Sequence, residues 1–268
     1  MADRTLGAPP PDSALSQALK QWLFSFQEFW LLTAQAFRNI AATPFYAADT
    51  FLQMDSIGVG SLPIVVLTGF FTGAVMALQL SATLTEYGQI DRLGQLVSLS
   101  LVLELGPVLS ALMIGARNAS GMASELGSMV VTEQIDAMRA LGTDPVKKLV
   151  TPRLIATIVM TFFLTLIADM CGIVGGWVYA VMGIHMNGAL YWFSAFRILD
   201  ASSMIQGLIK PLIFGGIIAT VGCYYGMKAR GGTQGVGRAT TQAVVLASLL
   251  IIISDFLLSR LLVGILGT

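Results

Sequence analysis

"LGQLVSLSLVLELGPVLSALMIGA", Leu93–Ala116, decides the fold class of this chain, because its 24 residues contain a single charge, Glu104. An α-helix crosses the bilayer core with about 20 apolar residues, whereas a barrel strand needs only about ten, alternating in polarity. The whole chain of 268 residues is 55% hydrophobic and 11% charged, less than half the roughly 25% charged residues of soluble domains. The sequence therefore predicts an all-α integral membrane protein.

Four other apolar runs have the length of membrane spans. With Leu93–Ala116 they predict five transmembrane helices, at about 57–80, 93–116, 154–184, 205–227 and 242–267. Residues 14–40 differ, because a charged or amide residue recurs every turn or two among aromatic residues at helical spacing. This pattern predicts an amphipathic helix lying in the membrane interface or re-entering it, rather than a sixth span. Residues 1–13 contain three consecutive prolines and are predicted to be a disordered N-terminus.

The distribution of Lys and Arg predicts the orientation. Five basic residues lie in the loop 117–153 and three in 228–238, whereas the other two loops between spans have one each. The positive-inside rule therefore places these two loops and the N-terminus in the cytoplasm.

A polar, amphipathic segment separates the second and third spans. We expect a short helix at about 132–141, with Thr132 as its N-cap, Gly142 as its stop and Pro145 preventing its resumption. Val131, Ile135 and Met138 would form one apolar stripe at i, i+4 and i+7. A solvated loop is the simpler interpretation of such a charge run. The apolar stripe and the short connections to both spans favour a coupling helix that docks on a motor protein.

The surrounding sequence resembles the central segment of the MlaE/YrbE family of ABC-transporter permeases. The matching motifs are ELGPV at Glu104–Val108, AxELGxMxVTEQIDA at Ala123–Ala137 and DPxxxLVxPR at Asp144–Arg153. Residues 237–256 resemble the family's last span, and the resemblance covers about residues 55–265. It implies that residues 55–268 form a permease transmembrane domain.

The resemblance also implies a function and a set of partners. A homodimer would move phospholipid or another hydrophobic lipid between the bacterial inner membrane and a periplasmic MCE-domain carrier. A separate cytoplasmic ATPase would drive it and would contact the coupling helix through Glu133, Gln134, Ile135, Asp136, Met138 and Arg139. ATP and Mg²⁺ would bind to that partner, because this chain has no GxxxxGK[ST] phosphate loop. No cofactor, metal or catalytic residue is expected in the chain itself, and its zero net charge argues against a nucleic-acid partner.

The glycine-rich stretch at 229–238 is expected to be a flexible cytoplasmic turn that touches the ATPase.

Ionisable residues inside the predicted spans are candidate functional residues, because each costs about 2.5–3.5 kcal/mol at membrane depth. The resemblance places a lipid cavity around Glu104 and Lys210, where Lys210 would face an anionic headgroup and Glu104 would be paired or protonated. Asp255 has a functional and a packing interpretation of equal weight. Leu103 stands where some relatives carry a basic residue, so the headgroup contacts are expected to differ.

Asp169 is assigned to helix packing, because glycines follow it at Gly172, Gly175 and Gly176. Gly-xxx-Gly spacing at 69/73, 172/176 and 222/226 predicts close helix contacts, within one subunit for at least two of the three pairs.

Two other classes of protein fit the sequence less well. A proton-coupled secondary transporter would use Glu104, Asp169 and Asp255, but the five spans show no convincing internal repeat. A membrane-embedded lipid-modifying enzyme would need a catalytic constellation that the sequence does not present.

Overall fold

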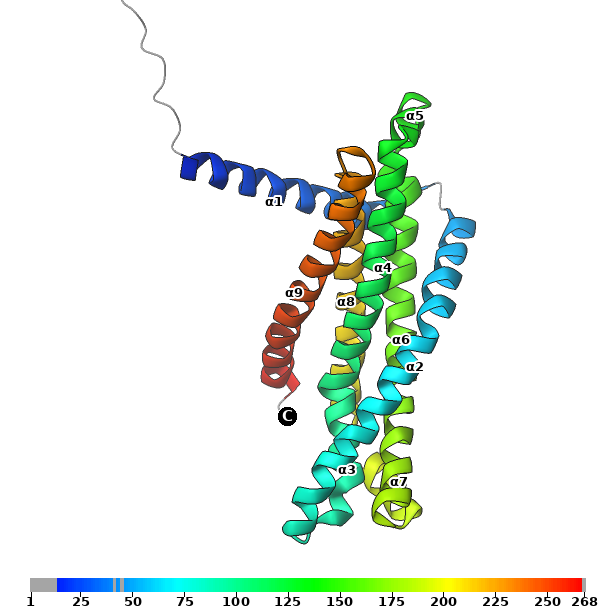
Figure 1. Cartoon of the computed structure of the whole chain (residues 1–268), viewed down its shortest axis with the longest axis vertical. Coiled ribbons are helices and arrows are strands. Elements are labelled where there is room, and N and C mark those ends of the chain that lie inside the picture. The colour runs from blue at the N-terminus through cyan, green and yellow to red at the C-terminus, as the bar shows by residue number, and fades with distance from the viewer. Residues whose placement is uncertain (1–13, 41, 44–45, 267–268) are drawn as a thin grey trace, which may run out of the picture.

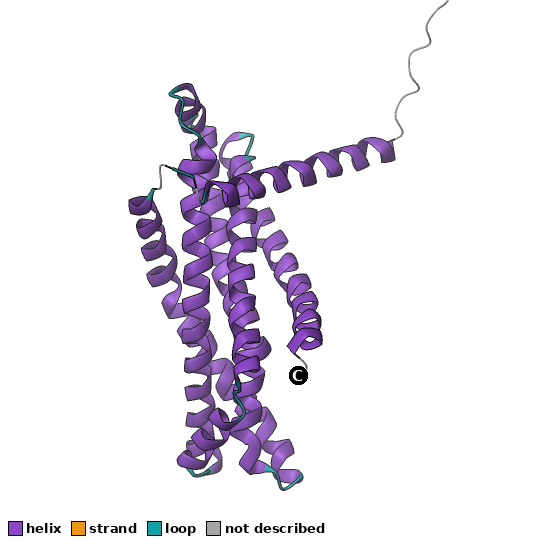
Figure 2. Ribbon diagram, turned by 180° about the vertical axis from the view of Figure 1, so that it is seen from behind, coloured by secondary structure: helices purple, strands orange, loops and turns teal. Residues whose placement is uncertain are grey.

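The computed structural model describes residues 14–40, 42–43 and 46–266. Within these ranges all regular structure is helical, and no strand occurs (Figure 2). In chain order the elements are α1 (Ala14–Asn39), α2 (Ala47–Glu86), η1 (Ile90–Arg92), α3 (Leu93–Ser100), η2 (Leu101–Leu105), α4 (Gly106–Val131), α5 (Gln134–Ala140), η3 (Val146–Val150), α6 (Thr151–Ile184), α7 (Gly188–Arg197), α8 (Ala201–Met227) and α9 (Gly232–Leu266).

Five helical runs are long and apolar enough to cross a membrane, which confirms the predicted fold class and number of spans. They are Ala47–Glu86, Ile90–Val131, Val146–Ile184, Ala201–Met227 and Gly232–Ile265. All five begin before the apolar runs predicted from the sequence. The 40 residues of α2 extend about 60 Å at 1.5 Å per residue, about twice the bilayer core. The long helices therefore project beyond the lipid, and α5 lies at the tip of the projection next to α4 (Figure 1).

Glycines allow the long helices to pack closely. A Cβ on Gly73 of α2 would lie 1.8 Å from the carbonyl oxygen of Gly172 in α6. Gly222 of α8 lies equally close to α4, since a Cβ on Gly222 would lie 3.0 Å from the Cα of Ala119. Gly176 faces the Tyr191 hydroxyl. All three Gly-xxx-Gly pairs thus pack within this chain.

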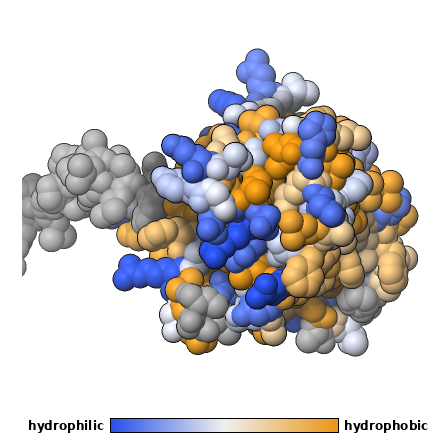
Figure 3. Space-filling view, turned by 90° about the horizontal axis from the view of Figure 1, so that it is seen from below, coloured by the Kyte–Doolittle hydropathy of each residue, from blue (hydrophilic) through white to orange (hydrophobic). Residues whose placement is uncertain are grey.

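The outer surface of the bundle is apolar. Phe51 and Leu52 of α2 and Phe256 of α9 expose 70%, 68% and 65% of their surface. Seen from the end that carries α3 and α7, polar side chains gather near the middle and apolar ones surround them (Figure 3). This distribution suits helices whose sides contact lipid and whose ends contact water.

Helices α1 and α7 lie at opposite ends of the bundle. α1 runs across the end that carries α5, with its axis at a steep angle to the spans (Figure 1). α7 was predicted to be part of a loop, and that prediction is wrong. Asn187 caps α7 by accepting a hydrogen bond from the Ala189 N–H (2.9 Å), and the buried Tyr191 hydroxyl donates to the Ile173 carbonyl (3.2 Å).

The glycine-rich stretch after α8 is mostly helical rather than a flexible turn. Only residues 228–231 form the connection, and α9 begins at Gly232. Gly231 and Gly232 adopt φ values of +90° and +66°, which a side chain would disfavour. The turn predicted for 229–238 is therefore confined to its first three residues.

Candidate functional site

The second span is interrupted by a π-helical turn, η2, that holds Glu104. In a regular α-helix the Leu103 carbonyl would accept from the N–H of residue 107, but this residue is Pro107 and has none. The Lys210 ammonium of α8 donates to that carbonyl instead (2.7 Å). Gly207, one turn earlier on α8, brings the two backbones together, since a Cβ there would lie 2.4 Å from the Val102 carbonyl oxygen.

Lys210 is the centre of an ion cluster inside the bundle. Its Nζ lies 2.7 Å from Glu104 Oε2 and 3.0 Å from Asp255 Oδ1 of α9. The Ser259 hydroxyl lies 3.0 Å from Glu104 Oε1. The Lys210 side chain is 1% exposed, that of Asp255 19% and that of Glu104 48%. One buried cation therefore joins two carboxylates from two other helices, and the cluster reaches the surface through Glu104.

The cluster brings together four residues that the sequence analysis selected separately. Lys210 is enclosed and saturated by its partners, so it does not stand as the open headgroup contact that the sequence analysis described. Leu103 takes part through its backbone carbonyl rather than its side chain. Sequence reasoning missed Ser259, although its position one helical turn after Asp255 could have indicated it.

Asp169 lies next to the π-helical turn but outside the ion cluster. It is 8% exposed, and its Oδ1 occupies the space where a Cβ on Gly106 would lie, at 1.6 Å. That oxygen has no hydrogen-bond partner among the described residues. Nearby, the hydroxyls of Ser110 and Thr165 lie 2.7 Å apart and join α4 to α6. The position of Asp169 in a tight helix contact agrees with the packing interpretation.

The segment between the second and third spans forms a short helix, α5, but starts it differently from the prediction. Thr132 is the C-cap of α4, and its hydroxyl donates to the Ser128 carbonyl (2.9 Å). Glu133 then adopts a left-handed conformation with φ +57° and breaks the chain direction, so Thr132 is not the N-cap of α5. After α5, Gly142 has φ +78°, and the N–H of Thr143 donates to the Met138 carbonyl (3.0 Å), as at a helix end that a glycine terminates.

The predicted apolar stripe is divided between two helices. Val131 ends α4, Ile135 is buried at 2% exposure against the rest of the chain, and Met138 is half-buried. Asp136 and Arg139 form an exposed ion pair of 2.9 Å along α5, and Gln134 and Glu133 are also exposed. Leu141, just after α5, is 83% exposed. Ile135 thus anchors α5 inward, and the outward surface carries polar side chains, the small Ala137 and Ala140, and Leu141.

The chain after α5 is fastened to three other helices. Gln35 of α1 donates to Asp144 Oδ2 (3.1 Å), Lys148 pairs with Asp49 of α2 (2.6 Å), and Arg153 pairs with Glu125 of α4 (2.8 Å). Pro145 does not end a helix here. It begins the next helical run, which Asp144 caps by accepting from the Val146 N–H (2.9 Å).

Helix α1 contacts the end of α8. Lys228 pairs with Glu28, and Phe29 packs edge-on against Tyr224 at a centroid distance of 5.3 Å. The Tyr224 hydroxyl donates to the Ser25 carbonyl (2.9 Å). Desolvation lowers the pKa of Lys228, but hydrogen bonds with Glu28 and Tyr224 outweigh this effect and raise it. Lys228 is therefore a permanent cation that holds α1 in place.

Five apolar helical spans with facing charges inside the bundle define a multi-pass membrane protein with a polar centre at membrane depth. A protein-family model described as "Permease MlaE" matches residues 50–261. The chain therefore belongs to the MlaE permease family, as its sequence motifs indicated, and is an ABC-transporter permease, a transport subunit rather than an enzyme.

Individual relatives agree with this assignment. The chain is 42% identical over 234 residues to a probable ABC transporter permease protein of Rickettsia typhi. The aligned region covers 87% of this chain and 90% of that protein. It is 35% identical to the chloroplastic protein TRIGALACTOSYLDIACYLGLYCEROL 1 of Arabidopsis thaliana, over 85% of this chain and 65% of the relative. It is 32% identical to the intermembrane phospholipid transport system permease protein MlaE of Haemophilus influenzae, over 79% and 82% of the two chains.

Proposed function

We propose that this chain is the inner-membrane permease subunit of an ABC transporter for phospholipid or another hydrophobic lipid. A separate cytoplasmic ATPase drives the movement, and a periplasmic MCE-domain carrier exchanges lipid with the permease. Family membership and a relative named for intermembrane phospholipid transport support the proposal. The proposed contact with the ATPase is supported by the position of α5 (Figure 1). This helix is exposed at the tip of the bundle, and ion pairs hold the chain that follows it against the long helices.

In this proposal α5 transmits force from the ATPase to the spans. The residues for this role are Glu133, Gln134, Ile135, Asp136, Met138 and Arg139, with Ile135 as the inward anchor and the exposed ones as contacts. The ties from Lys148 and Arg153 to α2 and α4 make the base of the third span move with its neighbours. A push on α5 would therefore shift several spans together rather than bend one loop.

The ion cluster forms the polar part of the lipid pathway. Glu104 is half exposed while Lys210 and Asp255 are enclosed, so Glu104 presents a hydrogen-bond acceptor to a lipid headgroup and Lys210 keeps it in place. Leu103 contributes the carbonyl that fixes Lys210. A cluster of this kind lets one polar contact exist at membrane depth without an unpaired buried charge.

A second copy of the chain covers α9. Only 11% of the most apolar part of this helix is buried, against 61% for α8. Its exposed residues include Val245, Leu249, Ile252, Ile253, Phe256 and Leu257. Because Asp255 lies on the same helix, a homodimer formed through α9 would place the two ion clusters on either side of a shared pathway.

The test of the ATPase contact uses Leu141, the most exposed large hydrophobic residue in the described part of the chain. Leu141→Asp should leave the permease folded but reduce co-purification of the ATPase subunit by about tenfold or more, because burying a carboxylate in an interface costs more than about 1.4 kcal/mol. Ile135→Asp is a poor probe, since Ile135 is buried in the permease itself.

Tyr87→Asp is the matched control, because Tyr87 is 72% exposed and is the C-cap of α2, which ends beside α3 at the end of the bundle opposite α5 (Figure 1). The control should retain the ATPase. If both variants co-purify with the ATPase as well as the wild type does, α5 does not contact the ATPase.

A further inference from the structure

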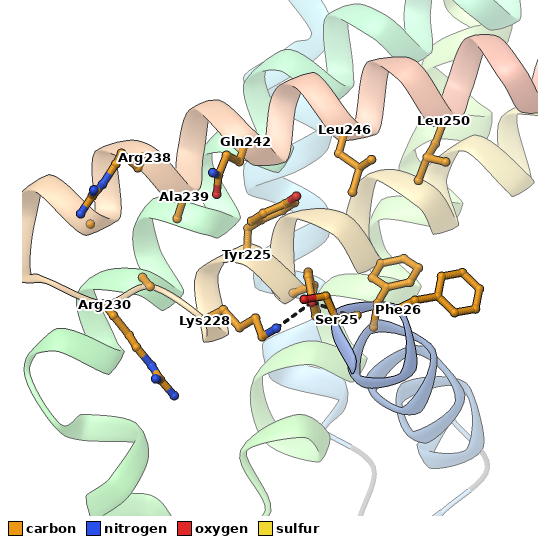
Figure 4. Close-up of a pocket in the computed structure, with 14 residues that line it drawn as sticks. Ser25, Phe26, Tyr225, Lys228, Arg230, Arg238, Ala239, Gln242, Leu246 and Leu250 are labelled. Carbon is orange, nitrogen blue, oxygen red and sulfur yellow. Dashed lines mark hydrogen bonds between the residues drawn. The ribbon is translucent and has the colours of Figure 1, made fainter. Parts of the chain in front are cut away.

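A cavity of about 710 Å³ lies between α1, the end of α8, the α8–α9 turn and α9 (Figure 4). Phe29, Tyr224 and Lys228 of the α1–α8 contact line it, but no residue of the ion cluster or of α5 does. Lys228 on its wall lies 18 positions after Lys210, which is about 27 Å along a helix. The cavity is therefore a separate site at the end of the bundle that carries α5. Its volume is in the range of sites for small organic ligands, about 300–1,000 Å³.

The wall that α9 contributes changes from cationic to apolar along one face. Arg238, Gln242, Leu246 and Leu250 recur every four residues and span about 18 Å. Figure 4 shows Arg238 near the turn and the two leucines at the far end, where Phe26 of α1 approaches. The cavity thus has a polar entrance beside the turn and an apolar interior that continues along the span.

The charged side chains that line the cavity are all cationic. Its lining includes Lys228, Arg230 and Arg238 and no carboxylate. Lys228 is already paired with Glu28 and donates to the Tyr224 hydroxyl (2.9 Å). Arg230 and Arg238 are exposed and have no ion-pair partner in the ranges that the structure describes. Two guanidinium groups are suited to bind a phosphate, because each presents several donors in a planar fork.

We propose that this cavity binds an anionic phospholipid from the leaflet at the α5 end of the bundle. The phosphate lies between Arg230 and Arg238, and the acyl chains follow Leu246 and Leu250. Basic pockets between spans at the cytoplasmic surface favour anionic lipids by this combination of charge and apolar contact. The bound lipid would contact both α1 and the α8–α9 turn and would join them beside α5.

The test uses the full chain in phosphatidylcholine vesicles that contain a trace of phosphatidylglycerol with a photoactivatable diazirine in its acyl chain. After illumination, mass spectrometry should find the label on α9 near Leu246 and on α1 near Phe26. Labelling should fall about fivefold in each of the single variants Arg230→Gln and Arg238→Gln, and roughly thirtyfold in the double variant. Leu246→Trp, which keeps both arginines but fills the apolar part, should also reduce it.

Arg92→Gln is the matched control, since Arg92 is an exposed arginine at the other end of the bundle. It should leave the labelling unchanged, and a phosphatidylcholine probe with the same diazirine should label the cavity far less. Equal labelling by both probes, or unchanged labelling in the double variant, would overturn the proposal. If the double variant keeps its label but loses the ATPase subunit, the arginines serve a protein contact instead.

Discussion

Replacing Lys210 with methionine removes the cation that joins three helices. Methionine follows the lysine side chain as far as Cε and lacks only the ammonium, so the main change is the loss of contacts at 2.7 and 3.0 Å to Glu104 and Asp255 and of the donor to the Leu103 carbonyl. Breaking a buried ion pair by removing one partner costs about 3–5 kcal/mol. Because the Glu104 side chain is 48% exposed, water can solvate its carboxylate once Lys210 is gone. The loss in free energy of unfolding therefore arises mainly at the enclosed Asp255 carboxylate and is about 3 kcal/mol.

The free energy of unfolding should be measured by denaturant titration in detergent micelles. Glu104→Gln should cost only about 1 kcal/mol, because it removes the more exposed partner and leaves the second carboxylate paired. The double variant Lys210→Met with Asp255→Asn should be at least about 1 kcal/mol more stable than the sum of the single changes predicts. Strict additivity, or a Lys210→Met protein as stable as the wild type, would show that the ion cluster does not hold the helices together.

Two further outcomes test the packing and the helix ends. Gly73→Ala should strongly destabilise the contact between α2 and α6, since its Cβ would lie 1.8 Å from the Gly172 carbonyl oxygen. Gly264→Ala places its Cβ in open space and should leave stability unchanged, so thermal unfolding should show a lower midpoint for the first variant only. Hydrogen bonds from the Ser203 side chain and backbone, and from the Ser202 hydroxyl, lower the pKa of Asp200, which caps α8. A lowered folded-state pKa stabilises the protein above the ordinary pKa of about 3.9, so the stability difference between wild type and Asp200→Ala should shrink as the pH falls below that value. A difference that stays constant or grows with acidification would contradict the role of the cap.

The five spans could be predicted from the sequence because each depends only on a local run of apolar residues. Glu104, Lys210 and Asp255 could be selected for the same reason, since a charge inside such a run is conspicuous. That they meet could not be predicted from local patterns. Their meeting depends on the π-helical turn, on Pro107 and on the close approach at Gly207, which are properties of two helices packed together.

Thr132, α7 and the glycines after Gly231 depart from their local sequence patterns for a common physical reason. Thr132 has the side chain of an N-cap, but the α4 helix runs on until this residue and uses its hydroxyl to bond back to Ser128. α7 was missed because ten residues carry little periodic signal, and its stability comes from burying Tyr191 against α3 and α6. The glycines after Gly231 continue a helix because the neighbouring spans hold it in place. In each case tertiary packing outweighs local preference.

The exposed position of the cavity between α1 and α9 also escaped prediction. Arg230 and Arg238 could be counted as basic loop residues that set the orientation. Their arrangement above Leu246 and Leu250 follows only once α9 is known to start at Gly232 and to continue as one helix.

We propose above that a separate ATPase supplies the energy for lipid movement through this permease. The most direct measurement compares lipid transfer in vesicles that contain the permease alone, the permease with an imposed proton gradient, and the permease with its ATPase and ATP. We predict transfer only in the third case, and its loss when Leu141→Asp is introduced. Transfer driven by the proton gradient without an ATPase would contradict the proposal and would favour a proton-coupled transporter that uses Glu104, Asp169 and Asp255.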